Sequence, residues 1–278
     1  DEGFDSFVYS PQLGKALLFG QYHVISISDG EDQNAILAYD FPSNRWDIID
    51  ITEDAWSEHL PGVGHDEGNV AADTQHGLYL THGNLTLHGG TSFKTFSYDL
   101  NAGRGKRMMP STELPLTENV ASAYDPDHDL MLTYGVVDSG STAWLYDHNA
   151  NTWSAVSNSP VTTSRRNVVY DTRNHVFVVI GGGAVWTLDP VSKAWTKKAA
   201  TPPGVGDSAF DTVNGVVLSA IGRTGYTETQ VYDVANDLWT RLADGPVMTN
   251  VPGPSLTYDS VNQVFLRHTD SYLRGVWA

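Results

Sequence analysis

Apolar residues occur along the chain in short runs, and Asp, Asn and Gly interrupt these runs at close intervals. The clearest run is 176–180, which follows a polar turn at 171–175 and precedes Gly181 and Gly182. Short apolar runs bounded by turn-forming residues are typical of β-strands joined by hairpins. The pattern therefore predicts an all-β protein with almost no helix.

One repeated motif places a Trp six positions after an Asp, with Tyr or Leu immediately before the Asp. We interpret each copy as a hairpin in which one strand ends at the Asp and the next opens at the Trp. Because a Trp supplies a large apolar area, we expect these four to be buried between sheets. The copies are Asp40 with Trp46, Asp147 with Trp153, Asp189 with Trp195, and Asp233 with Trp239.

A second motif reads Tyr-Asp, a polar turn and an apolar run, and it interleaves with the first. Its Asp-type positions are 10, 73, 125, 171, 211 and 259, so that six units span nearly the whole chain. Together the two motifs describe four strands per unit. A lone four-stranded sheet cannot bury both of its faces, whereas sheets stacked around an axis bury them on one another. The sequence predicts one domain over residues 1–278, a six-bladed β-propeller.

The best copy of the combined motif resembles the kelch family. It has the apolar run 176–180, the glycines 181–183, Trp186, Asp189 and Trp195. Other copies are degraded at the Gly-Gly position, at 88–90, 135–136 and 222–223. The resemblance implies a kelch-type propeller but no single activity, because kelch propellers include oxidases, isomerases, lyases and pure interaction modules.

The last unit ends early. Residues 276–278 fall where earlier units have their third strand, so the outer strand of the last blade is expected to be missing. Either that blade has three strands or the sequence is part of a longer chain, and we favour the second. The first residues, Asp1 and Glu2, are consistent with a mature or excised piece.

Composition narrows the class of partner. The 278 residues carry 33 acidic and 16 basic side chains, a net charge of −17, which repels phosphate backbones and argues against nucleic acid. The absence of cysteine excludes disulfides, thiolate catalysis and the Cys–Tyr cross-link of galactose-oxidase-like enzymes. No apolar stretch is long enough to span a membrane. We expect a monomer located outside the cytoplasm, secreted or periplasmic; no cofactor can be assigned.

Two segments, 20–34 and 51–68, are unusually long for loops between strands of one blade or of neighbouring blades. The turns that follow the Tyr-Asp positions are short and alike. Since uneven loops on an even scaffold tend to carry function, we expect the ligand, a glycan or a protein, on the face with the long loops. Drift in loop length is the alternative.

Histidines gather in these loops and in the strands that lead into them. Neutral imidazoles suit proton transfer, and nearby polar groups can orient them. His76 lies on an opposite-face turn and is expected only to be solvated. No metal-ligand spacing such as HExxH occurs, so no metal ligand is predicted. Scattered loop histidines remain the alternative. The candidates are His23, His59, His65, His82 and His88, with Asp66 and Asn69 beside them.

Cationic residues form a second group on the same face. Arginines there can hold a carboxylate through two parallel hydrogen bonds, although pairing with Asp207 or Glu118 explains them as well. The candidates are Arg165, Arg166, Arg223 with Tyr226 nearby, and Arg267 with His268.

This mixture of His, Tyr and Arg is similar to the sites of propeller-fold polysaccharide lyases that cut uronic-acid glycans. The resemblance implies His65 or His88 as base, Tyr134 or Tyr226 as acid, and Arg165 or Arg166 as the group that neutralises the substrate carboxylate. We therefore expect a carbohydrate-handling propeller that binds an acidic glycan or cleaves it by β-elimination. The alternative is a non-catalytic kelch protein-interaction module. In either case His65, His82 and His88 should meet in one pocket.

Overall fold

The computed structural model describes residues 7–18, 36–49, 52–53, 70–84, 93–114, 118–137, 140–160, 166–204, 206–245, 255–269 and 275–278. All the regular secondary structure within these ranges is β-strand, which confirms the prediction of an all-β protein. No helix of the described residues is long and apolar enough to cross a membrane.

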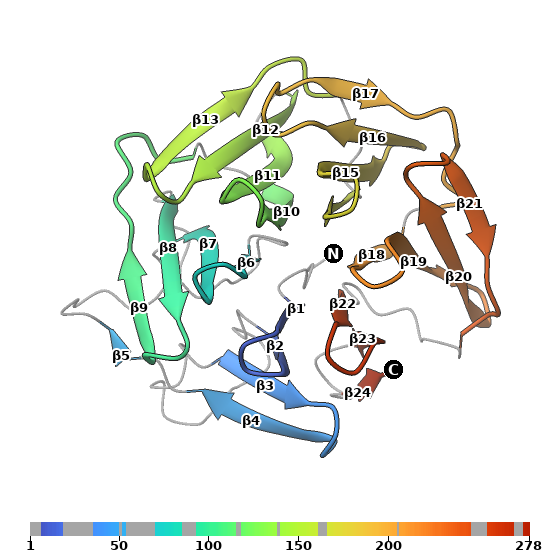
Figure 1. Ribbon diagram of the computed structural model, residues 1–278, viewed down its shortest axis with the longest axis horizontal. Helices are drawn as coiled ribbons and strands as arrows, with labels where there is room; N and C mark the ends of the chain where they lie inside the picture. The colour runs from blue at the N-terminus through green and yellow to red at the C-terminus, as the bar shows by residue number, and fades with distance from the viewer. Residues whose placement is uncertain are drawn as a thin grey trace.

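The strands form six sheets arranged around a central axis (Figure 1). The first sheet contains β1 (Phe7–Ser10), β2 (Lys15–Leu18), β3 (Ile36–Asp40) and β4 (Arg45–Ile49). The second contains β6 (Val70–Asp73), β7 (Leu78–Asn84), β8 (Phe93–Asp99), β9 (Arg104–Arg107) and, parallel to β9, the short β5 (Thr52–Glu53). The third contains β10 (Glu118–Asp125), β11 (Leu130–Val137), β12 (Gly140–Asp147) and β13 (Thr152–Val156). The fourth contains β14 (Arg166–Asp171), β15 (Val176–Gly181), β16 (Ala184–Leu188) and β17 (Trp195–Lys197). The fifth contains β18 (Asp207–Asp211), β19 (Val216–Arg223), β20 (Tyr226–Asp233) and β21 (Leu238–Arg241), and the last contains β22 (Ser255–Asp259), β23 (Val264–Thr269) and β24 (Gly275–Trp277).

The innermost strands β1, β6, β10, β14, β18 and β22 contact one another in sequence, and β22 contacts β1, so the ring is closed. The propeller prediction is thereby confirmed in its general form. The blade count is corrected: five sheets hold the four strands of a complete blade, not six, and the sheet of β22, β23 and β24 has three strands in the described residues.

The Tyr-Asp motif is a turn stabilised by its own carboxylate. Oδ1 of Asp171 accepts hydrogen bonds from the backbone N–H groups of Arg173 and Asn174 at 2.9 and 3.0 Å, and Oδ2 accepts one from the Asn174 amide at 2.7 Å. His175 then has a φ of 57°, a left-handed conformation that Gly77 and Gly215 adopt in the equivalent turns. Each such turn joins the first and second strands of a sheet. The side of the ring that carries these turns is called the turn face below, and the opposite side is the loop face.

The Asp-to-Trp motif is the turn between the third and fourth strands. Asp147 accepts a hydrogen bond from the backbone N–H of Ala150, and Tyr146 and Trp153 lie opposite each other with ring centroids 5.0 Å apart. The prediction that all four Trp are buried is only partly right. Trp153 is 7% exposed and belongs to the buried cluster between the second and third sheets, while Trp46, Trp195 and Trp239 pack only against the margins of such clusters and are half-buried.

Clusters of buried apolar side chains lie between neighbouring sheets. At the junction of the third and fourth sheets, for example, Leu132 and Tyr134 pack against Phe177 and Val179. Similar clusters join the first sheet to the second, the second to the third, the fourth to the fifth, and the first to the three-stranded sheet. The fifth sheet and the three-stranded sheet differ, because their described residues meet through an ion pair between Asp207 and Arg267.

Candidate functional site

Most of the histidines predicted for the loop face lie outside the described residues, as does the first candidate arginine. For His82 in β7 and Arg166 in β14 the structure describes the backbone but not the side chain. The predicted meeting of His65, His82 and His88 therefore stays a prediction. The candidates outside the described residues are His23, His59, His65, His88, Asp66, Asn69 and Arg165.

Tyr134, one of the two candidate acids, is a core residue of the third sheet. Its side chain is fully buried, its ring meets Trp195 edge-on at 5.8 Å, and its hydroxyl donates a hydrogen bond to the Pro160 carbonyl. These contacts hold the ring between the third and fourth sheets. A hydroxyl held in this way is not positioned to protonate a leaving group in solvent.

Arg223 and Tyr226 lie at the hairpin of β19 and β20, where both find partners within the protein. Arg223 Nε donates to Glu228 Oε2 at 2.7 Å, and its Nη2 donates to the Pro203 carbonyl at 2.9 Å. This hydrogen bond from Arg223 holds the pKa of Glu228 below its usual range. The Tyr226 ring lies 5.9 Å from the Arg241 guanidinium. Arg223 is thus already neutralised and is not a free partner for a ligand carboxylate.

Arg267 and His268 lie in β23 and are both 5% exposed. Arg267 donates to Asp207 Oδ2 at 3.1 Å and to Thr227 Oγ1 at 3.4 Å. The alternative reading, in which the arginine is paired with Asp207, is the one observed. The His268 ring packs against Phe7 and Trp46, with centroids 5.8 and 5.7 Å apart. Both side chains therefore hold the three-stranded sheet to its neighbours.

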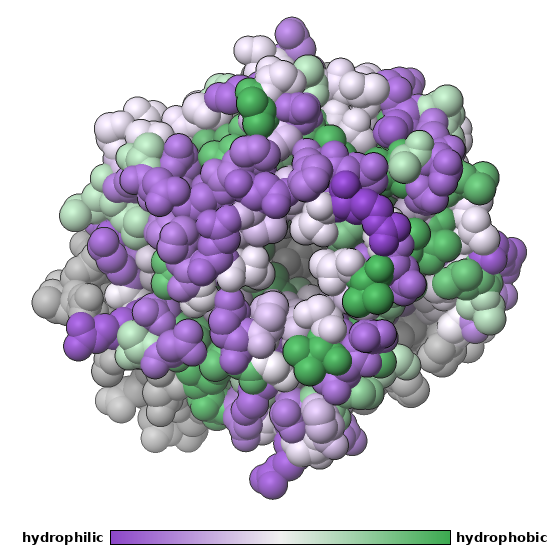
Figure 2. Space-filling model, in the orientation of Figure 1, coloured by the Kyte–Doolittle hydropathy of each residue, from purple (hydrophilic) through white to green (hydrophobic). Residues whose placement is uncertain are grey.

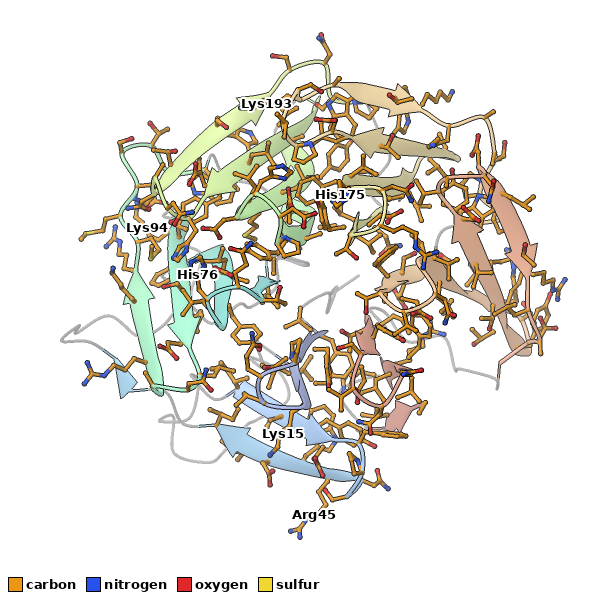
Figure 3. All side chains as sticks on the ribbon, in the orientation of Figure 1. Lys15, Arg45, His76, Lys94, His175 and Lys193 are labelled. Atoms are coloured by element: carbon orange, nitrogen blue, oxygen red, sulfur yellow. The ribbon has the colours of Figure 1, made fainter. Side chains whose placement is uncertain are left out.

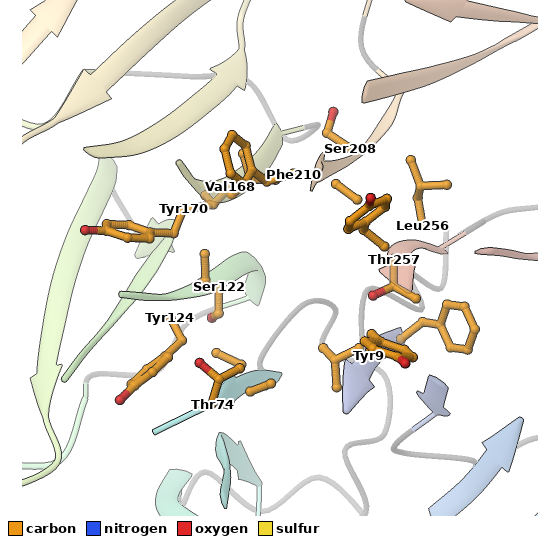
Figure 4. Close-up of a pocket in the computed structure, with 18 of the residues that line it drawn as sticks. Tyr9, Thr74, Ser122, Tyr124, Val168, Tyr170, Ser208, Phe210, Leu256 and Thr257 are labelled. Atoms are coloured by element: carbon orange, nitrogen blue, oxygen red, sulfur yellow. The ribbon is translucent and has the colours of Figure 1, made fainter. Parts of the chain in front are cut away.

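The innermost strands line a central cavity of about 300 Å³ (Figure 4). Its wall is built mainly from small and apolar residues such as Val8, Ala72, Val168 and Leu256, with tyrosines toward the turn face. Among the described residues that line it there is one carboxylate, Asp207, and no Arg, Lys or His. One face of the ring is hollowed at its centre and covered mostly by hydrophilic residues (Figure 2).

Asp207 is a further candidate site residue, although from the sequence we considered it only as a partner for an arginine. Burial raises its pKa from 3.8 to about 7, although Arg267 acts in the opposite direction. A carboxyl group with this pKa exchanges its proton near neutral pH, which is unusual for Asp. No sequence pattern marks it, because the shift comes from the surroundings of β18 and β23.

The raised pKa of Asp207 makes the stability of the protein depend on pH. Between pH 4 and pH 7 the folded state holds this proton while the unfolded state releases it, so the contribution of Asp207 to stability falls as pH rises toward 7. Replacing Asp207 with Asn should remove up to about 1 kcal/mol per pH unit of this slope. Urea unfolding of both proteins from pH 5 to pH 8 measures the difference, and parallel curves would contradict it.

The chain matches no protein-family model and no curated protein by sequence. Solved structures are similar in fold. TolB from Acinetobacter baumannii has a TM-score of 0.56 at 14% identity, over 87% of this chain and 55% of TolB. A structural genomics protein of unknown function from Bacteroides thetaiotaomicron has a TM-score of 0.59 at 11% identity, over 95% and 66% of the two chains. A chain of the nidogen/laminin complex has a TM-score of 0.55 at 8% identity, over 86% and 78%. This chain therefore spans about half of TolB, and the similarities support a propeller fold.

Proposed function

We propose that this propeller is a non-catalytic binding module that holds a protein partner on its loop face. The proposal rests on one observation: three of the candidate residues that the structure describes already have partners within the protein. Arg223 is paired with Glu228, Arg267 with Asp207, and the Tyr134 hydroxyl with a backbone carbonyl. Side chains that are already paired within the protein stabilise a rigid scaffold and are less available to take part in a reaction.

The requirements of β-elimination also favour a binding module over a lyase. The reaction needs a base at the carbon next to a carboxylate and a cation that neutralises that carboxylate as charge develops. Arg223, another arginine predicted to hold a carboxylate, could take this role only by leaving Glu228, whose side chain is 9% exposed, without its ion-pair partner. Removing one partner from such a pair is costly, so substrate binding would have to offset that cost.

The fold is compatible with a protein partner. A chain of similar shape belongs to the nidogen/laminin complex, an assembly of two proteins. A net charge of −17 favours a partner with a basic surface and accelerates its approach at low salt. We infer that the two segments predicted from the sequence to be long loops, 20–34 and 51–68, supply the contacts, although Thr52 and Glu53 of the second segment form β5.

Photo-crosslinking from the two faces tests this proposal. A photoreactive residue replaces Trp56, in the segment predicted to form the long loop, or Val213, which is 48% exposed on the turn face. We expect one protein adduct from position 56 and none from position 213, with the adduct reduced at high salt. The captured protein is then identified and its affinity measured with purified components. Equal adducts from both positions, or no measurable affinity, would overturn the proposal.

An acidic glycan is the second candidate, and Asp207 is the observation that favours it. A carboxyl group with a pKa of about 7 in the wall of the channel is suited to donating or accepting a proton. Incubation with uronate polysaccharides, followed by absorbance of the unsaturated product, separates the two functions. The binding module predicts no product. Product formation that is lost in both His65→Ala and Asp207→Asn would support the lyase instead.

We further propose that the blades are of kelch type and that the protein acts outside the cytoplasm. The glycines 182 and 183 support the first point, since they form the β15–β16 turn with φ of 60° and 73° at the position of the family's Gly-Gly. Cell fractionation of the native source tests the second point.

A further inference from the structure

Four potential metal ligands meet on the turn face, where the second and third sheets adjoin. Asp73 and His76 come from the turn between β6 and β7, Asp129 from the turn between β10 and β11, and His148 from the turn between β12 and β13. Each offers one ligand atom, and the four atoms lie within 4.8 Å of one another. We propose that this cluster binds a divalent transition-metal cation, with Zn²⁺ the best fit, and so links the two blades. The site is separate from the ligand surface proposed for the loop face.

The distances agree with tetrahedral coordination. In a tetrahedral Zn²⁺ site with bonds of about 2.0–2.1 Å, neighbouring ligand atoms stand roughly 3.4 Å apart. His76 Nδ1 lies 2.8 Å from Asp73 Oδ2 and 3.6 Å from Asp129 Oδ1. His148 Nδ1 lies 3.5 Å from Asp73 Oδ2 and 3.9 Å from Asp129 Oδ2. These four separations, two of which involve different oxygens of Asp129, bracket the ideal value, and one ligand atom from each residue lies within 4.8 Å of the other three.

One polar atom of the cluster lacks a hydrogen-bond partner. His148 Nδ1 is buried without a hydrogen-bond partner, although it faces both carboxylates. The side chains of Asp73 and Asp129 are 0% and 5% exposed, and the cationic groups that face them are imidazoles. A buried imidazole nitrogen without a partner is costly, and a cation held between it and the two carboxylates would remove that cost. Two imidazoles with two carboxylates form a donor set that suits Zn²⁺.

Outer contacts hold the carboxylates in place. The backbone N–H groups of Gln75 and His76 donate to Asp73 Oδ1 at 3.0 and 2.9 Å, which leaves Oδ2 directed at the imidazoles. Tyr124 donates its hydroxyl to Asp129 Oδ1 at 2.6 Å, and the Asn149 amide donates to Oδ2. Such second contacts orient ligands and raise the affinity of metal sites.

The repeat explains why this junction is special. In three other turns the position of His76 is occupied by Asn174, Asn214 or Asn262, whose amide donates to the preceding Asp at 2.7 Å. His128 makes the same contact with Asp125 at 2.8 Å, so the His–Asp contact alone is a feature of the turn. What differs is the addition of Asp129 and His148. Among the described residues, no second group of three or more ligands comes together as closely. His76, which we expected to be merely solvated, is part of this group (Figure 3).

The repeat also supplies a matched pair of variants. His76→Asn restores the residue that three sister turns already use, so it preserves the turn while removing one metal ligand. His128→Asn makes the same change in the next blade, outside the cluster. The purified chain is stripped with a chelator and titrated with Co²⁺, whose visible bands report tetrahedral coordination, and then with Zn²⁺ in competition.

We expect the wild type and His128→Asn to bind one Co²⁺ with tetrahedral bands that one equivalent of Zn²⁺ abolishes. His76→Asn and His148→Ala should lose these bands and bind Zn²⁺ at least about 100-fold more weakly, because even outer contacts are worth 10–100-fold. Saturating Zn²⁺ should raise the Tm of the wild type by roughly 5 °C and leave that of His76→Asn unchanged. Absence of tetrahedral Co²⁺ in the wild type would mean that the cluster is only a set of ion pairs. Bands that persist in His76→Asn would place the metal on other histidines. Either result overturns the proposal.

Discussion

Replacing Trp153 with Ala is expected to lower the free energy of unfolding by about 3–5 kcal/mol, the cost of truncating a large buried aromatic residue. Trp153 is 7% exposed and packs in the apolar cluster between the second and third sheets, with Leu80 from one side and Met131 from the other. Its indole N–H also donates to Thr95 Oγ1 in β8 at 2.8 Å. The substitution therefore removes both packing and a buried hydrogen bond across one junction.

Chemical denaturation followed by tryptophan fluorescence and circular dichroism measures this loss. Trp153→Phe keeps most of the apolar contact but not the N–H, so it should cost about 1–2 kcal/mol. Trp195→Ala is the matched control, because Trp195 has the same place in the repeat but is half-buried. It should cost clearly less than Trp153→Ala. Equal losses at both positions would mean that position in the repeat, rather than burial, determines the contribution.

Replacing Arg267 with Met is expected to cost about 3–5 kcal/mol at pH 8, because it leaves the Asp207 carboxylate buried without its partner. The side chains of Arg267 and Asp207 are 7% and 17% exposed, and described residues place no apolar cluster between the fifth sheet and the three-stranded sheet.

The pKa of Asp207 gives the experiment a second readout. With Arg267 removed, that pKa should rise above its present value of about 7, so the carboxyl is protonated and neutral at pH 5 and the penalty shrinks there. The double variant Arg267→Met with Asp207→Asn should recover part of the stability at pH 8. Arg241→Met is the control, since its pair with Asp244 is exposed to solvent, which screens the interaction. A loss for Arg267→Met at pH 8 that is no larger than the loss for Arg241→Met would contradict the prediction.

The repeat could be recognised in the sequence because the contacts that stabilise it join residues close together in the chain. An Asp that caps the two N–H groups following it, as Asp171 does, acts over three residues and leaves a fixed spacing in the chain. The contact between Tyr146 and Trp153 is likewise set by one hairpin. Strands, turns and the propeller fold follow from such short-range rules together with the need to bury both faces of each sheet.

Burial depth and the identity of polar partners were decided by the tertiary structure. Nothing local distinguishes Trp153 from Trp195, yet the first is covered by the neighbouring sheet and the second only in part. Arg267 looked like a ligand-binding group, but the packing of neighbouring sheets sets it against Asp207, 60 positions earlier in the chain. The same kind of packing brings His148 from one sheet to Asp73 of another, so the proposed metal site has no sequence spacing of its own. The repeat period determines the sheets, whereas contacts between sheets depend on how the ring packs.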